Sequence, residues 1–276
     1  MEDVALASRW WRAAGGWVIV RAAGAVVLLL ASVGRAKPAL VAGHGVTATF
    51  DRYGVIRAVS TRGTVLLEKG LLEGVSLGQH APHRTIRYFQ TWSCMRDARA
   101  VTAALKRRNG FDVEGSLSQP GRASAPTVAF RERYVRVKAG AIAVHAVLRC
   151  DQAALWAEPL RLSFYLPVAT FYGGVCRIEN SDDLVTTYPI TAKPLVRTNY
   201  FARAIWLRNA GREIKIVADR HSQLMLLDAR AWKEQALIIR LSRRRPWRKQ
   251  TPTPANYKVA LDATMRFNSG PPHAAR

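Results

Sequence analysis

Apolar and polar residues alternate along most of this chain, most clearly between Thr127 and Pro167. A period of two residues is typical of strands with one buried face, and the β-branched residues of the stretch support strands: Val135, Val137, Ile142, Val144 and Val147. Ala139-Gly140-Ala141 supplies a reversal between two strands, and Leu160 to Leu166 predicts another that ends at Pro167. We therefore expect the stretch to form the central antiparallel sheet.

The same alternation recurs on both sides of this stretch. It predicts a hairpin over Gly45–Ser60 that turns at Asp51–Gly54, where Gly54 takes a positive φ. Asp151–Glu158 is expected to be a short helical turn or an irregular crossing. Further strands are predicted at Thr64–Glu68, Leu71–Leu77, Val101–Lys106, Phe111–Leu117, Val175–Ile178, Phe201–Leu207, Glu213–Val217, Gln223–Asp228, Ala236–Ser242 and Tyr257–Phe267.

No helical periodicity is sustained anywhere, and no segment repeats at a fixed period. The predicted fold class is all-β, a large antiparallel β-sandwich. A chain of 276 residues is long enough for one such domain, which we place at residues 45–267, followed by a flexible tail at residues 268–276.

The first 36 residues have a different character. Arg9, Arg12 and Arg21 precede the apolar run from Ala22 to Val33, and Gly34-Arg35-Ala36 is a small-x-small site of the kind that signal peptidases prefer. We expect a signal peptide, and hence a secreted or periplasmic protein. An uncleaved membrane anchor is the alternative, since residues 17–33 are almost long enough to span a bilayer.

The composition adds a strong positive charge to this picture. The whole chain carries a net charge of +23, and residues 37–276, with 38 basic and 17 acidic residues, keep +21. A protein of this charge attracts polyanions, and salt weakens the attraction. Because the N-terminal segment indicates export, an anionic glycan is favoured over a specific nucleic acid.

Two segments combine aromatic and cationic residues. The interval between Gln79 and Arg99 contains His80, His83, Arg84, Arg87, Tyr88 and Trp92, and the tract from Arg243 to Lys249 contains Arg244 and Trp247. Aromatic rings stack on the apolar faces of sugars, and guanidinium groups bind carboxylates and sulfates through paired hydrogen bonds. We predict that these residues bind substrate, although they also fit loops whose rings pack and whose charges are solvated.

The sequence favours no metal and no cofactor. His80 and His83 have an H-x-x-H spacing without a third ligand nearby, and the acidic run from Glu179 to Asp183 lacks the alternating ligands and central glycine of a calcium loop. Cys94, Cys150 and Cys176 have no metal-site spacing and are expected to be structural, with at most one disulfide bond among them.

The succession of strands resembles the β-supersandwich of galactose-mutarotase-like carbohydrate proteins. The segments that carry the resemblance, within about residues 45–267, are TFDRYGVIRAVS, FRERYVRVKAGAIAVHAVLRC, LRLSFYLP before a glycine-rich turn, and IWLRNAGREIKIVADRHSQLMLLDAR. The resemblance implies a carbohydrate-binding or carbohydrate-processing protein. The paired histidines and carboxylate of the mutarotases have no residue-by-residue counterpart here, and the helical domain of related polysaccharide lyases is absent from the pattern.

Lyases of related architecture use a Tyr or His base beside a group that neutralises a uronate. The resemblance therefore implies His145, Tyr200 and His221 as catalytic candidates, with Asn199 as a neutralising group. His145 is next to Val144 in a predicted strand. The simpler interpretation is that it lies on a sheet face with one local hydrogen bond and has no catalytic role. We expect an exported protein that binds an anionic polysaccharide. The alternatives are a polysaccharide lyase-like or other sugar-processing enzyme and an envelope-associated protein that meets anionic membranes or polymers.

Overall fold

The computed structural model describes residues 20–22, 25–27, 39–51, 54–77, 99–117, 127–138, 140–153, 155–195, 200–243 and 254–269. The chain divides into two compact units, residues 1–36 and residues 37–276. In the first unit, β1 (Val20–Ala22) and β2 (Ala25–Val27) pair as an antiparallel hairpin. Within the described residues, no helix has the length and apolar character needed to cross a membrane.

The second unit contains two large antiparallel sheets. The first, which we call the β20 sheet, has the strand order β14, β13, β16, β17, β20, β11, β10, β9 and β8. In that order the strands span Val185–Pro189, Val175–Glu179, Ala204–Asn209, Arg212–Ala218, Tyr257–Ser269, Ala141–Cys150, Val128–Lys138, Gly110–Leu117 and Arg99–Arg107.

The second sheet, which we call the β12 sheet, has the order β15, β18, β19, β12, β7, β5, β4 and β3, with β6 paired to β5. These strands span Tyr200–Ala202, Ser222–Asp228, Ala236–Arg243, Leu155–Pro167, Lys69–Leu77, Ile56–Thr61, Val46–Phe50, Ala39–Gly43 and, for β6, Thr64–Leu67. Two single turns of helix, α1 (Val168–Phe171) and η3 (Ala229–Trp232), follow β12 and β18.

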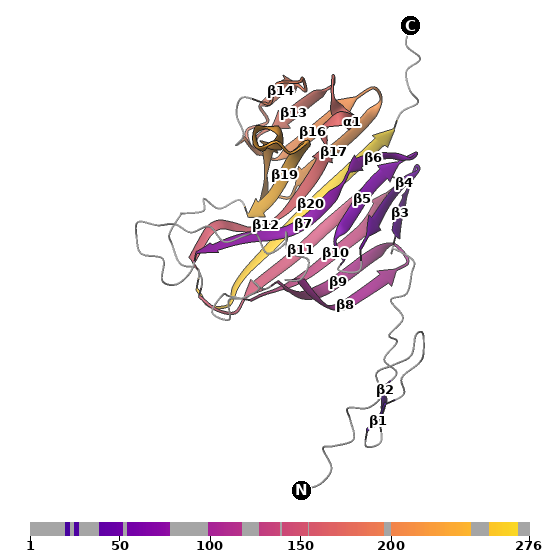
Figure 1. Cartoon of the computed structure of the whole chain (residues 1–276), viewed down its shortest axis with the longest axis vertical. Coiled ribbons are helices and arrows are strands. Elements are labelled where there is room, and N and C mark those ends of the chain that lie inside the picture. Colours follow the sequence, from indigo (N-terminus) through magenta and orange to yellow (C-terminus); the bar gives the residue numbers. More distant parts are fainter. Residues whose placement is uncertain are drawn as a thin grey trace. The chain divides into compact units, whose positions relative to one another are not determined.

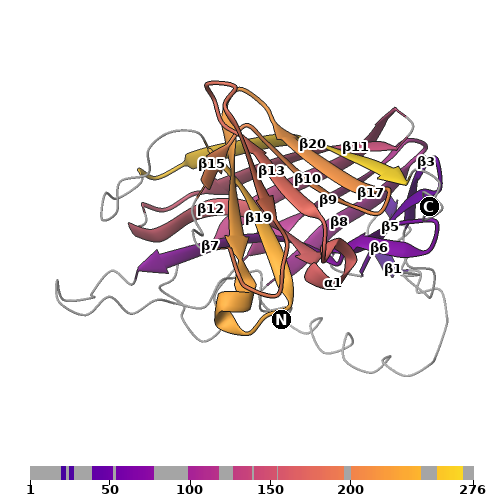
Figure 2. The ribbon, with the colours of Figure 1, turned by 90° about the horizontal axis from the view of Figure 1, so that it is seen from above.

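The two sheets are stacked as layers with the hydrophobic core between them (Figures 1 and 2). Alternation along the strands explains the packing, because every second residue of β10 from Val128 to Tyr134 is buried and those between are largely exposed. Within the core, Phe50 of the β12 sheet stacks on Phe111 of the β20 sheet with ring centroids 4.3 Å apart. The predicted all-β sandwich is therefore confirmed.

The predicted turns are present as well. Gly54 has a φ of 68° between β4 and β5, and Gly140 has a φ of 71° between β10 and β11. An ideal Cβ on Gly54 would lie 2.5 Å from Cγ2 of Val113, so close packing and the positive φ both require glycine there.

The prediction that Thr127–Pro167 forms one central sheet is wrong. β10 and β11 pair within the β20 sheet, whereas β12 lies in the β12 sheet between β7 and β19. The chain bends at Asp151 and Gln152 and crosses to the other layer. Of the two alternatives for Asp151–Glu158, the helical turn is wrong, because β12 already begins at Leu155. The irregular crossing is confirmed, with register shifts on either side of Glu158.

A second strand prediction also fails. Phe201–Leu207 reads as one strand, but β15 and β16 belong to different sheets and the break falls at Arg203. The backbone of Arg203 is already bonded to the β20 sheet, donating to the carbonyl oxygen of Glu179 on β13 at 2.8 Å and accepting from the amide of Ala218 on β17 at 2.9 Å. β14 was missed, because four of its five residues are exposed and the segment does not alternate.

Candidate functional site

The two segments predicted to bind substrate adjoin the same end of the β12 sheet. His80, His83, Arg84, Arg87, Tyr88 and Trp92, like Arg244 and Trp247, lie outside the described residues. Their attachment points are described: β7 ends at Leu77 and β19 ends at Arg243. Both strands flank β12 and run antiparallel to it, so they point in the same direction and the two segments leave from the same end of the sheet (Figure 1).

That end of the sheet carries a buried ionic cluster on its outer face, the side away from the core. Leu160, Leu162 and Phe164 of β12 point into the core, so the residues between them point outward. Oε1 of Glu73 on β7 accepts a hydrogen bond from Nε of Arg161 at 2.6 Å, and another from Oγ of Ser163. Nε of Arg240 on β19 lies 3.5 Å from the same oxygen.

The cluster is almost completely removed from solvent. The side chains of Glu73 and Arg161 are each 2% exposed, whereas that of Arg240 is 17% exposed. Burial by itself would raise the pKa of Glu73. The neighbouring charges of Arg161 and Arg240 and the hydrogen bonds from Ser163 and Arg161 outweigh burial and lower that pKa. Glu73 is therefore ionised at neutral pH and forms an ion pair with Nε of Arg240.

Aromatic and apolar side chains adjoin this cluster on the same face. Tyr165, two residues beyond Ser163, and Met225 of β18 pack together against a small second core of Leu227, Ala229 and Ile238. Nζ of Lys69 lies 4.8 Å from the centroid of the Tyr165 ring. Phe201, opposite Met225 on the edge strand β15, is 60% exposed. Aromatic surface thus lies beside an arginine whose side chain is 17% exposed. Aromatic rings bind the apolar faces of sugars, and arginines bind their acidic substituents.

The catalytic candidates are divided between the two sheets. His145 lies on the outer face of the β20 sheet, and its Nδ1 is hydrogen-bonded to Asp262 on the neighbouring strand β20. Tyr200 is on β15, in the other sheet. His221 lies in the turn between β17 and β18, where its Nε2 accepts from Nε of Arg220 at 2.9 Å.

The structure brings His145 and the turn that holds His221 to the same strand. The carbonyl oxygen of Asp262 accepts from the amide of Asp219 at 3.1 Å, and its amide donates to Oγ of Ser222 at 3.2 Å. Asp262 thus joins the partner of His145 to this turn. His145 has the local hydrogen bond on a sheet face that its position in the sequence suggests.

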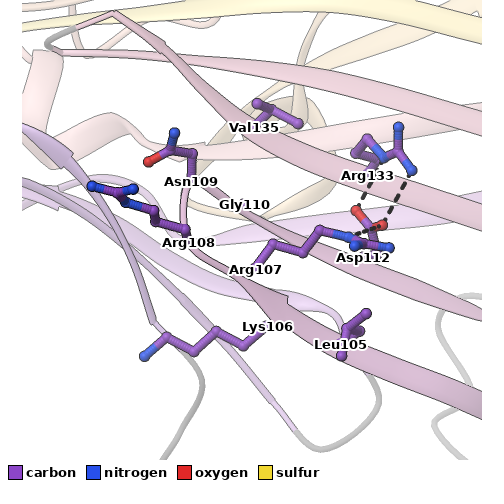
Figure 3. Close-up of a pocket in the computed structure, with 9 residues that line it drawn as sticks. All are labelled: Leu105, Lys106, Arg107, Arg108, Asn109, Gly110, Asp112, Arg133 and Val135. Atoms are coloured by element: carbon purple, nitrogen blue, oxygen red, sulfur yellow. Dashed lines mark hydrogen bonds and ion pairs between the residues drawn. The ribbon is translucent and has the colours of Figure 1, made fainter.

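An open pocket of about 720 Å³ lies on the outer face of the β20 sheet, at the hairpin of β8 and β9 (Figure 3). Arg107 and Arg133 converge there on the buried carboxylate of Asp112, with Nε–oxygen distances of 2.9 and 3.1 Å, whereas Lys106 and Arg108 point away from it. Burial tends to raise the pKa of Asp112, but the hydrogen bonds from Arg107 and Arg133 lower it overall. With four basic residues and one ionised carboxylate, the residues that line the pocket carry a net positive charge.

No protein-family model matches the sequence, and no curated protein matches it either. Several solved structures are similar to that of this chain. A galactose mutarotase-like protein from Lactobacillus casei superposes with a TM-score of 0.55 at 10% identity, over 84% of this chain and 100% of that one. An aldose epimerase homologue from C. elegans gives 0.55 at 9% identity, over 86% and 100%. Galactose 1-epimerase from Lactobacillus acidophilus gives 0.52 at 8% identity, over 83% and 92%.

This chain has the galactose mutarotase-like sandwich fold. The resemblance noted in the strand pattern is thereby confirmed. At identities of 8–10% the likeness concerns the galactose mutarotase-like fold alone and transfers no site residue.

Sequence reasoning missed the residues that this galactose mutarotase-like fold gathers most tightly. Glu73 and Arg161 are 88 positions apart, and no local spacing connects them. One signal was present: in LRLSFYLP, Arg161 and Ser163 alternate with large apolar residues and so must lie together on one face. Asp262 was missed for the same reason as Glu73, because its partner His145 is distant in sequence.

The metal and thiol predictions concern groups that are only partly described. Within the described ranges, no three His, Cys, Asp or Glu side chains are grouped as metal ligands, and the H-x-x-H pair lies outside those ranges. Cys150 and Cys176 are buried free thiols, so they are not bonded to each other. Burial raises the pKa of Cys176 to about 12, with a smaller contribution from Asp228.

Proposed function

We propose that the protein binds carbohydrate on the outer face of the β12 sheet, and that the ligand is an anionic polysaccharide met outside the cytoplasm. The observation that carries the proposal is the cluster of Glu73, Arg161 and Arg240 beside Tyr165, at the end of the sheet where residues 78–98 and 244–253 attach. The galactose mutarotase-like fold supports a carbohydrate ligand, because the solved proteins that share it are named as sugar epimerases and mutarotase-like proteins.

The proposed recognition follows from the chemistry of these side chains. Tyr165 and the exposed Phe201 offer apolar surface for the C–H faces of sugar rings. Arg240, the most exposed member of the cluster, is the group expected to bind a uronate or sulfate, because Glu73 and Arg161 are already buried against each other. The net charge of +21 on residues 37–276 adds long-range attraction, so binding should weaken as salt rises.

The test is calorimetric titration of the full chain with polygalacturonate and with neutral dextran, at low and at high salt. We expect binding to polygalacturonate only. Arg240→Gln should weaken it by about tenfold, the effect of one charge-assisted hydrogen bond. Arg131→Gln is the matched control, because Arg131 is 52% exposed, lies on the β20 sheet and is paired with Glu114. Failure to bind any acidic glycan at low salt would overturn the function, and an Arg240→Gln protein that binds normally would overturn the site.

The hydrogen-bonded pair of His145 and Asp262 supports a second candidate, a sugar-processing enzyme of polysaccharide lyase type. A histidine held by a carboxylate is suited to remove a proton from a carbon next to a uronate. Incubation with uronate polymers should then produce unsaturated, ultraviolet-absorbing ends, and His145→Gln should abolish them. Polymers left intact across pH and added metals would eliminate this candidate.

For location, we propose that residues 1–36 direct export or anchor the protein to the cell envelope. Deleting them should retain the protein in the cytoplasm. Recovery of the full chain in the membrane fraction through residues 17–33 would favour the anchored, envelope-associated form, whereas a soluble exported protein that lacks residues 1–36 would favour cleavage. An unchanged location after the deletion would contradict both.

A further inference from the structure

The outer face of the β20 sheet carries a row of cations that local sequence does not show. Arg177 of β13, Trp206 of β16, Lys215 of β17 and Arg266 of β20 are successive partners across four neighbouring strands. Neighbouring strands are about 4.8 Å apart, so the row extends about 14 Å at right angles to the strands. It contains three positive charges and no acidic residue.

Trp206 positions two of these cations. Nζ of Lys215 lies 3.9 Å from a ring centroid of Trp206, and Cζ of Arg177 lies 5.7 Å from one. An aromatic ring holds a cation without cancelling its charge, whereas a carboxylate would neutralise it. The row is therefore a fixed set of charges available to an anion.

Charges of both signs surround Lys215. Burial is the largest cause that lowers the pKa of Lys215; Glu179 opposes this shift, Arg266 and Arg203 add to it, and Glu213 opposes it least. Glu179 is itself paired with Arg203. A bound anion would offset the cost of burial and favour the charged form of Lys215.

Next to the cation row lies a strip of short side chains. Two positions along the strands, cross-strand partners place Ala204, Val217, Thr264, Ala143 and Val135 in line across five strands, and Glu179 of β13 continues this line beyond Ala204. Two positions further, longer polar groups return with Asp262, His145 and Arg133. At about 3.3 Å per residue, the cation row and this second polar row are about 13 Å apart, with the strip between them.

The strip continues into the basic pocket at the hairpin of β8 and β9. Val135, its last member, and Arg133, at the end of the second polar row, both line that pocket. Arg107 of the pocket, which converges with Arg133 on Asp112, continues the line of cations on this face (Figure 3). A linear polymer lying across the strands would have the cation row along one side and the basic pocket at the β10 end. At the β13 end the line reaches Glu179, which is paired with Arg203.

We propose that this strip is a second binding surface for an acidic polysaccharide, which lies extended across the strands with its anionic groups on Arg177, Lys215 and Arg266. The choice of ligand rests on the function proposed above, whereas the surface itself does not share a residue with the first site. Because the two surfaces are the outer faces of opposite sheets, one molecule can hold two chains and link them.

Two variants of the full chain test the surface, with polygalacturonate oligosaccharides as the probe. In the double variant Lys215→Gln/Arg266→Gln, calorimetry should show one class of site in place of two and a loss of about tenfold or more at the second. Trp206→Leu keeps every charge and should weaken the second site about two- to fivefold, the contribution of a cation–π contact. Arg131→Gln, on the same face but outside the row, should bind as the wild type does.

The outcomes separate this surface from the first site. Light scattering with long polygalacturonate should show linked aggregates for the wild type and none for the double variant. A double variant that binds and links chains like the wild type, while Arg240→Gln loses affinity, would overturn the second surface and leave the first intact. A wild type that binds no acidic glycan would overturn both. Binding of anionic phospholipid vesicles, but not of the glycan, through Lys215 and Arg266 would also overturn the proposal.

Discussion

Glu73→Gln is the substitution that most directly tests how the ionic cluster is held. The change keeps the size of the side chain and an oxygen acceptor for Arg161 but removes the charge. The two side chains are each 2% exposed and joined by a hydrogen bond of 2.6 Å, so the Arg161 guanidinium would lose its carboxylate in a site that water does not reach. Breaking a buried pair from one side costs about 3–5 kcal/mol, which for a domain of this size lowers the melting temperature by about 6–20 °C.

Urea unfolding followed by circular dichroism gives the measurement, and Glu114→Gln is the matched control. Glu114 also lies on a strand and pairs with an arginine at 2.9 Å, but its side chain and that of Arg131 are 44% and 52% exposed. Solvent screening limits such a pair to about 1 kcal/mol or less. Equal unfolding midpoints for the two variants would show that burial does not make the Glu73–Arg161 pair more stabilising than the exposed Glu114–Arg131 pair.

The pH dependence gives an independent check with a definite sign. The pKa of Glu73 is lowered in the folded protein from an ordinary value of 4.5, so its contribution to stability is complete above pH 4.5 and is lost as the pH falls towards the folded value. The stability gap between the wild type and Glu73→Gln should therefore narrow below pH 4.5. A gap that stays constant on acidification would contradict the lowered pKa.

Three further outcomes follow from local geometry. Gly54→Ala should destabilise the fold by more than the strain of a positive φ, about 1–2 kcal/mol, because its Cβ would lie 2.5 Å from Val113. Gly63 has a φ of +80° but open space around it, so Gly63→Ala should cost only that strain. Melting curves of the two variants that coincide would contradict this. Cys176 should resist a maleimide at pH 8 until the protein unfolds, as peptide mass mapping can show, because burial raises the pKa of its thiol to about 12. Asp228→Asn should loosen the loop before β15, detected as faster hydrogen exchange at Leu195, whose amide donates to Asp228 Oδ2 at 2.8 Å; unchanged exchange there would exclude that role.

For much of the candidate chemistry, the sequence indicates which residue types are present but not which of them lie together. His145 was expected on a sheet face with one hydrogen bond, and alternation suffices for that, but its partner Asp262 lies 117 positions away. The same distance problem hides the first site, since Glu73 and Arg240 come from strands on either side of β12. Cross-strand neighbours are set by sheet order, which periodicity does not encode.

The row of Arg177, Trp206, Lys215 and Arg266 illustrates the limit in another way. Each residue stands at an outward position that alternation predicts, yet the four lie on four different strands and no local spacing connects them. They become one surface only because β13, β16, β17 and β20 are consecutive in the β20 sheet.

The sequence by itself determined most of the strands with their turns and buried faces, because the two-residue period and the glycines at positive φ are local properties of the backbone. Only the tertiary structure decided which sheet each strand joins. β12 leaves the hairpin of β10 and β11 for the opposite layer, and the apparent strand at Phe201–Leu207 divides at Arg203 between both layers. Both choices depend on which distant strand covers each apolar face and completes its backbone hydrogen bonds, and the stretch from Thr127 to Pro167 accordingly belongs to two sheets rather than one.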